Sequence, residues 1–321
     1  MKHVLLIALS LFTISSAAFG QVASGSAKEP SEKTVIERLG YPLDSKLLII
    51  HADDLGMAHS VNAASTKALD HGLVNSASLM VPCPWFPEIA AYARSHPEAD
   101  WGLHLTLTSE WKYYRWGPVL SRDRAKTLLD RDGYLYPTGA EVAAHSDIGE
   151  VEAEMRLQIA RAKAFGIKPT HLDSHMGTLY QNRVLLGVLL RVGRDNGLPV
   201  MVSREWLDRD ESLRSLLGPN DIVINRIVSI VPNVLADEWE DFYVRTIKNI
   251  QPGITEMIVH LAYDDEEMRA ATIDHTDWGA RWRQRDFELF TSEKLRRVLQ
   301  ESNVKLITWR ELGKTIAGPE R

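Results

Sequence analysis

The sequence lacks several features that would point to particular classes of protein. Its 321 residues include a single cysteine, Cys83, so no disulfide can form within the chain. Lysine and arginine total 37 against 43 aspartates and glutamates, which leaves no basic surplus for binding nucleic acid phosphates. Neither a GxGxxG nor a GxxxxGKS/T motif follows the first apolar run of the mature chain, so a nucleotide-binding fold has little support.

The N-terminus has the pattern of a secretory signal peptide. Lys2 precedes an apolar stretch over 4–14, and small residues follow up to Gly20. A membrane anchor is the alternative, but the stretch is shorter than the roughly 20 residues that a spanning helix needs. We therefore expect cleavage after Gly20, a secreted or periplasmic protein, and no stable membrane insertion afterwards. The expected organisation is a signal peptide over 1–20, a flexible leader over 21–40 and one folded domain over 41–316.

Apolar runs alternate with helical patterns along the rest of the chain. Eight strands are predicted, beginning near 46, 76, 101, 170, 198, 221, 255 and 304, and helices are predicted over 63–71, 88–95, 151–165, 183–196 and 287–301. Residues 108–148 break this rhythm with an aromatic-rich excursion. Strand–helix alternation indicates a parallel sheet with helices outside, and eight strands favour a distorted (β/α) barrel in the α/β class. A doubly wound open sheet is the alternative.

Polar side chains gather at the predicted ends of four strands. They are Asp53 and Asp54 after the first strand, His104 in the third, Asp173 and His175 after the fourth, and His260 after the seventh. The C-terminal ends of parallel strands share one edge, where catalytic groups of such folds collect. One aspartate and two histidines suffice to bind a divalent metal and leave positions open for water and substrate. Taken singly, Asp53 and Asp54 also suit a helix N-cap and a solvated loop acid.

The chain resembles the YdjC-like carbohydrate deacetylases, also called the chitooligosaccharide deacetylase family. The resemblance covers roughly residues 45 to 310 and is carried by LLIIHADDLGMAHSVNAA, HGLVNSASLMV, WGLHLTL and FGIKPTHLDSHMG. It implies a distorted (β/α) barrel related to other polysaccharide deacetylases. It also implies metal-assisted removal of an acetyl group from an N-acetylated oligosaccharide.

The resemblance assigns roles to individual residues. Asp54, His104 and His175 match the metal ligands, and Asp53 matches the general base. His260 matches a late histidine that supports the leaving group, and we expect it to protonate the departing amine. Two histidines and one aspartate favour zinc, while magnesium prefers more oxygen ligands but is allowed by the resemblance.

Two positions depart from the family pattern and keep other functions open. Gly177 stands where a further histidine is usual, and Leu261 follows His260 in place of proline. These departures affect the prediction of the substrate and of the residue that protonates the departing amine. They suggest a substrate with a different acyl sugar from that of the family. A metal-dependent hydrolase of another ester, amide or phosphoester, and a catalytically impaired carbohydrate-binding protein, are the alternatives.

Several other residues have weaker predicted roles. His171 and Asp173 either orient the ligands or make ordinary polar contacts at a strand end, and Arg204 either binds sugar or forms a surface salt bridge. The aromatic excursion would either stack on sugar rings or form a small satellite core. We expect His51 to be structural or exposed and the charge run over 264–267 to be a solvated loop.

Overall fold

The computed structural model describes residues 33–316. The predicted signal peptide and most of the predicted leader lie outside these residues. Among the described residues, no helix combines the length and the apolar character needed to cross a membrane.

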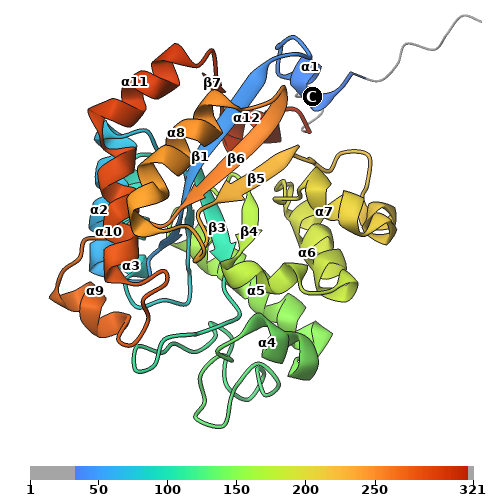
Figure 1. Cartoon of the computed structure of the whole chain (residues 1–321). Helices are drawn as coiled ribbons and strands as arrows, with labels where there is room; N and C mark the ends of the chain where they lie inside the picture. The colour runs from blue at the N-terminus through green and yellow to red at the C-terminus, as the bar shows by residue number, and fades with distance from the viewer. Residues whose placement is uncertain (1–32, 317–321) are drawn as a thin grey trace, which may run out of the picture. The chain divides into compact units, whose positions relative to one another are not determined.

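A parallel sheet forms the centre of the described chain (Figure 1). Its hydrogen-bonded order is β4-β3-β2-β1-β6-β5, and the short strand β7 pairs with the first half of β1. The strands are β1 (Lys46–Leu55), β2 (Ser76–Leu79), β3 (Trp101–Leu105), β4 (Leu172–Ser174), β5 (Arg226–Ser229), β6 (Gly253–Val259) and β7 (Lys305–Leu306).

Two short segments close this sheet into a ring. Val200 forms a parallel bridge with Leu172 of β4, and Ser203 forms one with Ile224. The amide of Asn225 then donates to the carbonyl of Ile254 in β6 at 2.9 Å. The strand predicted near 198 therefore exists as a bridge-forming segment, and the strand predicted near 221 begins with such a segment and forms β5 from Arg226 onward. The ring confirms the distorted barrel predicted from the sequence. We call the part of the ring between β4 and β5, which contains the bridges of Val200 and Ser203, the seam.

Helices cover the outside of the barrel (Figure 1). Helix α6 matches its predicted range, whereas the helix predicted over 287–301 is two helices, because Ser292 caps the second by accepting from the amide of Leu295. The α-helices are α1 (Val35–Arg38), α2 (His59–His71), α3 (Phe86–Ser95), α4 (Gly139–His145), α5 (Ile148–Ala164), α6 (Arg183–Asn196), α7 (Arg204–Arg209), α8 (Trp239–Lys248), α9 (Glu266–Ala271), α10 (Ala280–Phe290), α11 (Glu293–Glu301) and α12 (Trp309–Lys314).

Strand β1 supplies both layers of the core, since alternate side chains of a strand point to opposite faces. Leu48 and Ile50 join the large cluster that the helices share. Leu47 and Ile49 belong to a second cluster with Ile254, which fills the barrel interior. This burial on both faces explains the continuous apolar run in the sequence. The inward-facing row continues upward with His51 and Asp53, so the same alternation carries polar groups to the upper end of the barrel.

The aromatic excursion is part of the large core cluster and not a separate satellite core. Trp111 and Trp116 are 2% and 3% exposed and belong to the cluster that contains Leu48 and Ile50. The indole of Trp116 donates to the carbonyl of Thr108, and the hydroxyl of Tyr114 donates to the carbonyl of Met57. These bonds hold the excursion against the end of the barrel where the strands terminate.

The charge run over 264–267 is not the solvated loop that we expected. Asp265 caps α9 by accepting from the amide of Met268. Glu267 accepts from the amides of His59 and Ser60, which are the first residues of α2. A carboxylate at a helix N-terminus satisfies free N–H groups and complements the helix dipole. The run therefore joins two helices that are distant in sequence.

Gly102 in β3 permits a close approach that gives a stability test. A Cβ there would lie 2.3 Å from Nε2 of His171, whose ring is stacked on Trp309. We expect Gly102→Ala to lower the free energy of unfolding by about 1–3 kcal/mol, measured by urea denaturation. Gly117→Ala is the control, since its nearest neighbour would be 3.8 Å away. Equal stability of the two variants would contradict this packing.

Candidate metal centre and its cavity

The end of β1 presents two adjacent aspartates to the same side, which a regular strand cannot do. The pairing of β1 with β2 shifts register between Ala52 and Leu55, and Asp54 has a φ of 65°. Such a bulge adds a residue and redirects the side chains next to it. It explains how Asp53 and Asp54 both reach the upper end of the barrel interior.

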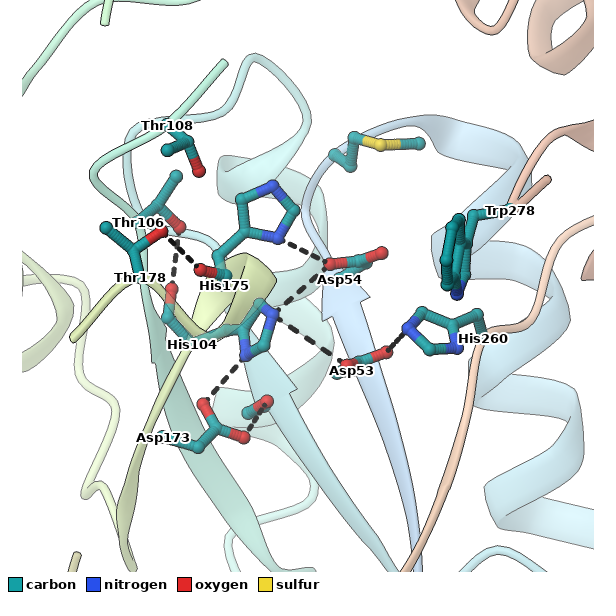
Figure 2. A network of polar contacts seen from close by, with 12 residues as sticks. Asp53, Asp54, His104, Thr106, Thr108, Asp173, His175, Thr178, His260 and Trp278 are labelled. Atoms are coloured by element: carbon teal, nitrogen blue, oxygen red, sulfur yellow. Dashed lines mark hydrogen bonds and ion pairs between the residues drawn. The ribbon is translucent and has the colours of Figure 1, made fainter. Parts of the chain in front are cut away.

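The three predicted metal ligands meet at one point. Oδ1 of Asp54 lies 3.3 Å from Nε2 of His104 and 3.1 Å from Nδ1 of His175. One donor atom from each of the three buried residues lies within 4.8 Å of the others. Figure 2 shows both imidazoles turned toward Asp54. This donor set, one carboxylate and two imidazoles, fits a divalent metal ion.

The two predicted catalytic residues lie beside this set. Nε2 of His260 is 3.4 Å from Oδ1 of Asp53, and Nε2 of His104 is 3.8 Å from Oδ2 of Asp53. In Figure 2, His260 approaches Asp53 from the side opposite His104. The structure thus brings together all five residues predicted for catalysis or metal binding.

Asp173 orients His104, as the sequence suggested it could. Its Oδ1 is 2.8 Å from Nδ1 of His104, which leaves Nε2 of that ring facing Asp54. Its Oδ2 accepts from Ser78 at 2.8 Å and lies 3.1 Å from His51. Burial favours the neutral acid, but the charges and hydrogen bonds of His104 and His51 hold the pKa of Asp173 well below its usual range.

Two other histidines lie near this site. Nδ1 of His171 is 3.0 Å from Oγ1 of Thr170 and its ring stacks on Trp309, and a donor atom of His171 lies within 4.8 Å of donor atoms of His51 and Asp173. His51 is a buried structural residue, and its contact with Asp173 also links it to a predicted ligand. Arg204 is exposed at the start of α7.

Two charged residues of the site were missed from the sequence. Arg283 of α10 donates to Oδ2 of Asp54 at 2.7 Å and to the carbonyl of Trp278 at 2.6 Å. Glu110 of the aromatic excursion lies 3.0 Å from Nε2 of His175. An arginine in an amphipathic helix and an acid in a long loop are ordinary in sequence. Only their positions in the fold connect them with the predicted ligands.

Unequal partners shift the pKa values of the two buried aspartates in opposite directions. Burial and the neighbouring Asp54 raise the pKa of Asp53 to about 7. Burial acts on Asp54 in the same direction, but the guanidinium of Arg283 and bonds from both histidines hold its pKa well below the usual range. Asp54 is therefore the permanent anion, while Asp53 can accept a proton near neutral pH.

The environment of His260 also favours its neutral form. Burial lowers the pKa of His260 to about 3. The backbone amide of His260 donates to Asp286, which also accepts from the hydroxyl of Tyr243 at 2.7 Å. These bonds fix His260 next to Asp53.

A cavity of about 590 Å³ opens beside these groups. Asp53, Asp54, His104, His175 and His260 line its polar side. Across from them lies a set of apolar side chains from the seam and its neighbours, which we call the apolar wall: Tyr180, Met201, Trp206, Ile227 and Ile258. Trp111, Met176 and Trp278 also border the cavity, and Gly177 lines it where the family pattern has a histidine.

The fold and the site place the chain among parallel barrels with an aspartate–histidine centre at the ends of their strands. The chain belongs to the YdjC-like protein family, whose model matches residues 47–301.

Several relatives share most of their length with this chain. A carbohydrate deacetylase of Thermus thermophilus is 30% identical over 86% of this chain and 97% of its own. One of Brevibacillus brevis is 27% identical over 83% of this chain and 99% of its own. A crystal structure from Enterococcus faecalis, named for a suggested role in cellobiose-phosphate cleavage, superposes with a TM-score of 0.70 at 25% identity, covering 84% of this chain and 99% of that one.

The ligand set can be tested by metal content. We expect His104→Ala to lose its bound divalent metal, because it removes one of three ligands. Asp173→Asn keeps the ligands but disturbs the orientation of His104, and should weaken metal affinity about 10–100-fold. The bound metal of both variants is measured by elemental analysis after dialysis against buffers of defined metal concentration. His59→Ala, an exposed histidine bonded to Glu88, is the control. Metal binding by His104→Ala at wild-type affinity would show that His104 is not a metal ligand.

Proposed function

We propose that this chain is a metal-dependent carbohydrate deacetylase that hydrolyses the acetamide of N-acetylated oligosaccharides. The observation that carries the proposal is the buried set Asp54, His104 and His175 with the separate carboxylate Asp53 beside it. Membership of the YdjC-like family and relatives named carbohydrate deacetylase support it. A relative named chitooligosaccharide deacetylase, from Serratia marcescens, is 31% identical over 169 residues.

Asp54, His104 and His175 would hold the metal ion. A divalent cation bound there supplies Lewis acidity, which polarises a carbonyl and makes water more acidic. We propose zinc on the donor types, with magnesium as the second possibility. Arg283 and Asp173 keep the donor atoms of Asp54 and His104 pointing toward one another.

Asp53 is the proposed general base. Its raised pKa matches it to proton transfer near neutral pH, where a base is most effective. It removes a proton from the attacking water as the new C–O bond forms at the acetyl carbon. When the C–N bond breaks, that proton goes to the departing nitrogen, which leaves as an amine.

His260 is the proposed donor of that proton to the amine. Its Nε2 lies 3.4 Å from Asp53, close enough for a small adjustment to bring the two into hydrogen-bond contact. Since its pKa is low, His260 does not store a proton at neutral pH. It passes on the proton that Asp53 has taken, so the two residues act as one unit.

The charge of the cavity favours amide or ester hydrolysis over phosphoester hydrolysis. Asp53, Asp54, Glu110 and Asp173 line the site, while its buried cation, Arg283, is already paired with Asp54. The proposed metal ion would offset part of this negative charge, and the carboxylates that it leaves uncompensated would repel a phosphate dianion more than a neutral acetamide.

If Asp53 is the general base, its substitution should lower activity without removing the metal. Asp53→Asn should release acetate from N-acetylglucosamine oligosaccharides about 10²–10⁴-fold more slowly, as loss of a general base does, while it still binds metal. Asp44→Asn, an exposed residue outside the cavity, is the control. Chelation of the wild type should also abolish acetate release, and added metal should restore it. Full activity of Asp53→Asn would show that the base lies elsewhere.

We further propose that the chain is exported and that its signal peptide is removed. Lys2, the apolar stretch over 4–14 and the small residues before Gln21 support this. After expression in a bacterium with its full leader, the mature protein should begin at Gln21, as determined by mass spectrometry of its N-terminal peptide. A chain of full length in the cytoplasmic fraction would contradict export.

A further inference from the structure

The cavity has one polar side and one apolar side. The acetyl group of the proposed substrate is small and would contact only a small part of the apolar side. The proposed ligands and catalytic groups come from the ends of β1, β3, β4 and β6, while further titratable groups (Glu110, His275, Asp277 and Arg283) reach the cavity from loops and α10. The apolar wall comes from the segment after His175, the seam, α7, β5 and β6. An acetyl group contributes a single methyl carbon beyond the carbonyl, so most of the apolar wall would remain without a partner.

The apolar wall reaches deeper into the barrel than the proposed catalytic groups. Ile258 of β6 precedes His260, which directly follows that strand, by two residues, and both line the cavity. Ile227 precedes Ser229 by two residues on β5, and Ser229 pairs with Ile258. Residues two apart on a strand face the same side and are separated by roughly 6.6 Å. The wall therefore extends about that far below His260.

The lower end of the wall continues into the core of the barrel. Met201, Ile227 and Ile258 belong to or pack against the interior cluster that contains Ile49 and Ile254. The ring of Tyr180 lies 4.5 Å from that of Trp206, which closes one side of the wall. Ile227, Ile258 and Trp206 are only half-buried, so they have apolar surface to offer to a ligand.

This surface suits an alkyl chain better than a sugar ring. A buried hydroxyl without a partner is unfavourable, and in the wall only Tyr180 and Trp206 carry a hydroxyl or N–H group that could bond it. A buried methylene instead improves binding about fourfold, the equivalent of ~0.8 kcal/mol. The outer border of the cavity has Trp111, Trp278, His275 and Asp277, which combine aromatic faces with polar groups and suit a pyranose.

We propose that the preferred substrate is an amino sugar whose N-acyl group is longer than acetyl, a straight chain of roughly four to eight carbons lying along the apolar wall. This rests on the proposed function, since the reaction is the same. Water adds to the amide carbon, the C–N bond breaks, the proton goes to the amine, and the acyl group leaves as a carboxylic acid. Length of the acyl chain is thus the specificity that the wall determines.

The test uses the metal-loaded full mature protein and a series of N-acylglucosamine oligosaccharides. The acyl groups are acetyl, butyryl, hexanoyl and octanoyl, and the free amine formed is measured for each. We expect kcat/KM to rise from acetyl to hexanoyl by about fourfold for each methylene that the wall buries. Hydrolysis of acetyl with a lower kcat/KM for every longer chain would overturn the inference and leave the proposed function standing. No turnover of any member would overturn both.

Substitutions of apolar-wall residues test whether the wall determines the preference for acyl-chain length. Ile227→Phe fills the pocket and should lower the ratio of kcat/KM for hexanoyl to that for acetyl at least tenfold. Ile227→Ala enlarges the pocket and should shift the preference toward octanoyl. Val228→Phe places the same ring on the opposite face of β5 and should keep the wild-type ratio. Thermal unfolding of each variant reports folding. Equal ratios in all folded variants would overturn the assignment of the wall.

Discussion

The bulge at the end of β1 is the constraint on which the rest of the site depends. A regular strand would send Asp53 and Asp54 to opposite faces, one into the barrel and one toward the helices. The register shift and the left-handed conformation of Asp54 bring both to the same side. A positive φ is unfavourable for most residues, though aspartate tolerates it better than most. The bonds from Arg283, His104 and His175 to Asp54 hold that conformation in place.

The same bonds resolve the electrostatic problem of burying several carboxylates together. Each buried anion would cost several kcal/mol without a partner, and removing one partner leaves the other uncompensated. Asp54 has Arg283 and two imidazoles, and Asp173 has His104, His51 and Ser78. Asp53 has weaker partners, with the nearest histidine nitrogen at 3.4 Å. Burial and the charge of Asp54 therefore raise the pKa of Asp53 to about 7, because the nearby histidines offset them only in part. The difference in partners makes Asp54 a fixed anion and Asp53 a proton acceptor.

The elements that follow from local periodicity, and the site residues that follow strand ends, could be predicted from the sequence. The apolar run of β1 and the helix over 183–196 are local patterns, and the gathering of Asp54, His104 and His175 follows from parallel topology. The functional roles of these residues stay predictions. Arg283 and Glu110 could not be found, because a helical arginine and a loop glutamate carry no local signal. The break between α10 and α11 was missed because the apolar spacing continues across Ser292. The role of Glu267 depends on contact with α2, more than two hundred residues away.

The seam has a consequence for how this barrel can diverge. Single bridges at Val200 and Ser203 close the ring there, whereas β1, β2 and β3 are joined by ladders of several residue pairs, interrupted between β1 and β2 by the bulge. Three residues of the apolar wall, Met201, Trp206 and Ile227, come from the seam or border it, while the aspartates and His104 come from β1 and β3. A substitution in the seam can therefore alter the apolar wall while the contacts of Asp54 with Arg283 and His104 stay in place.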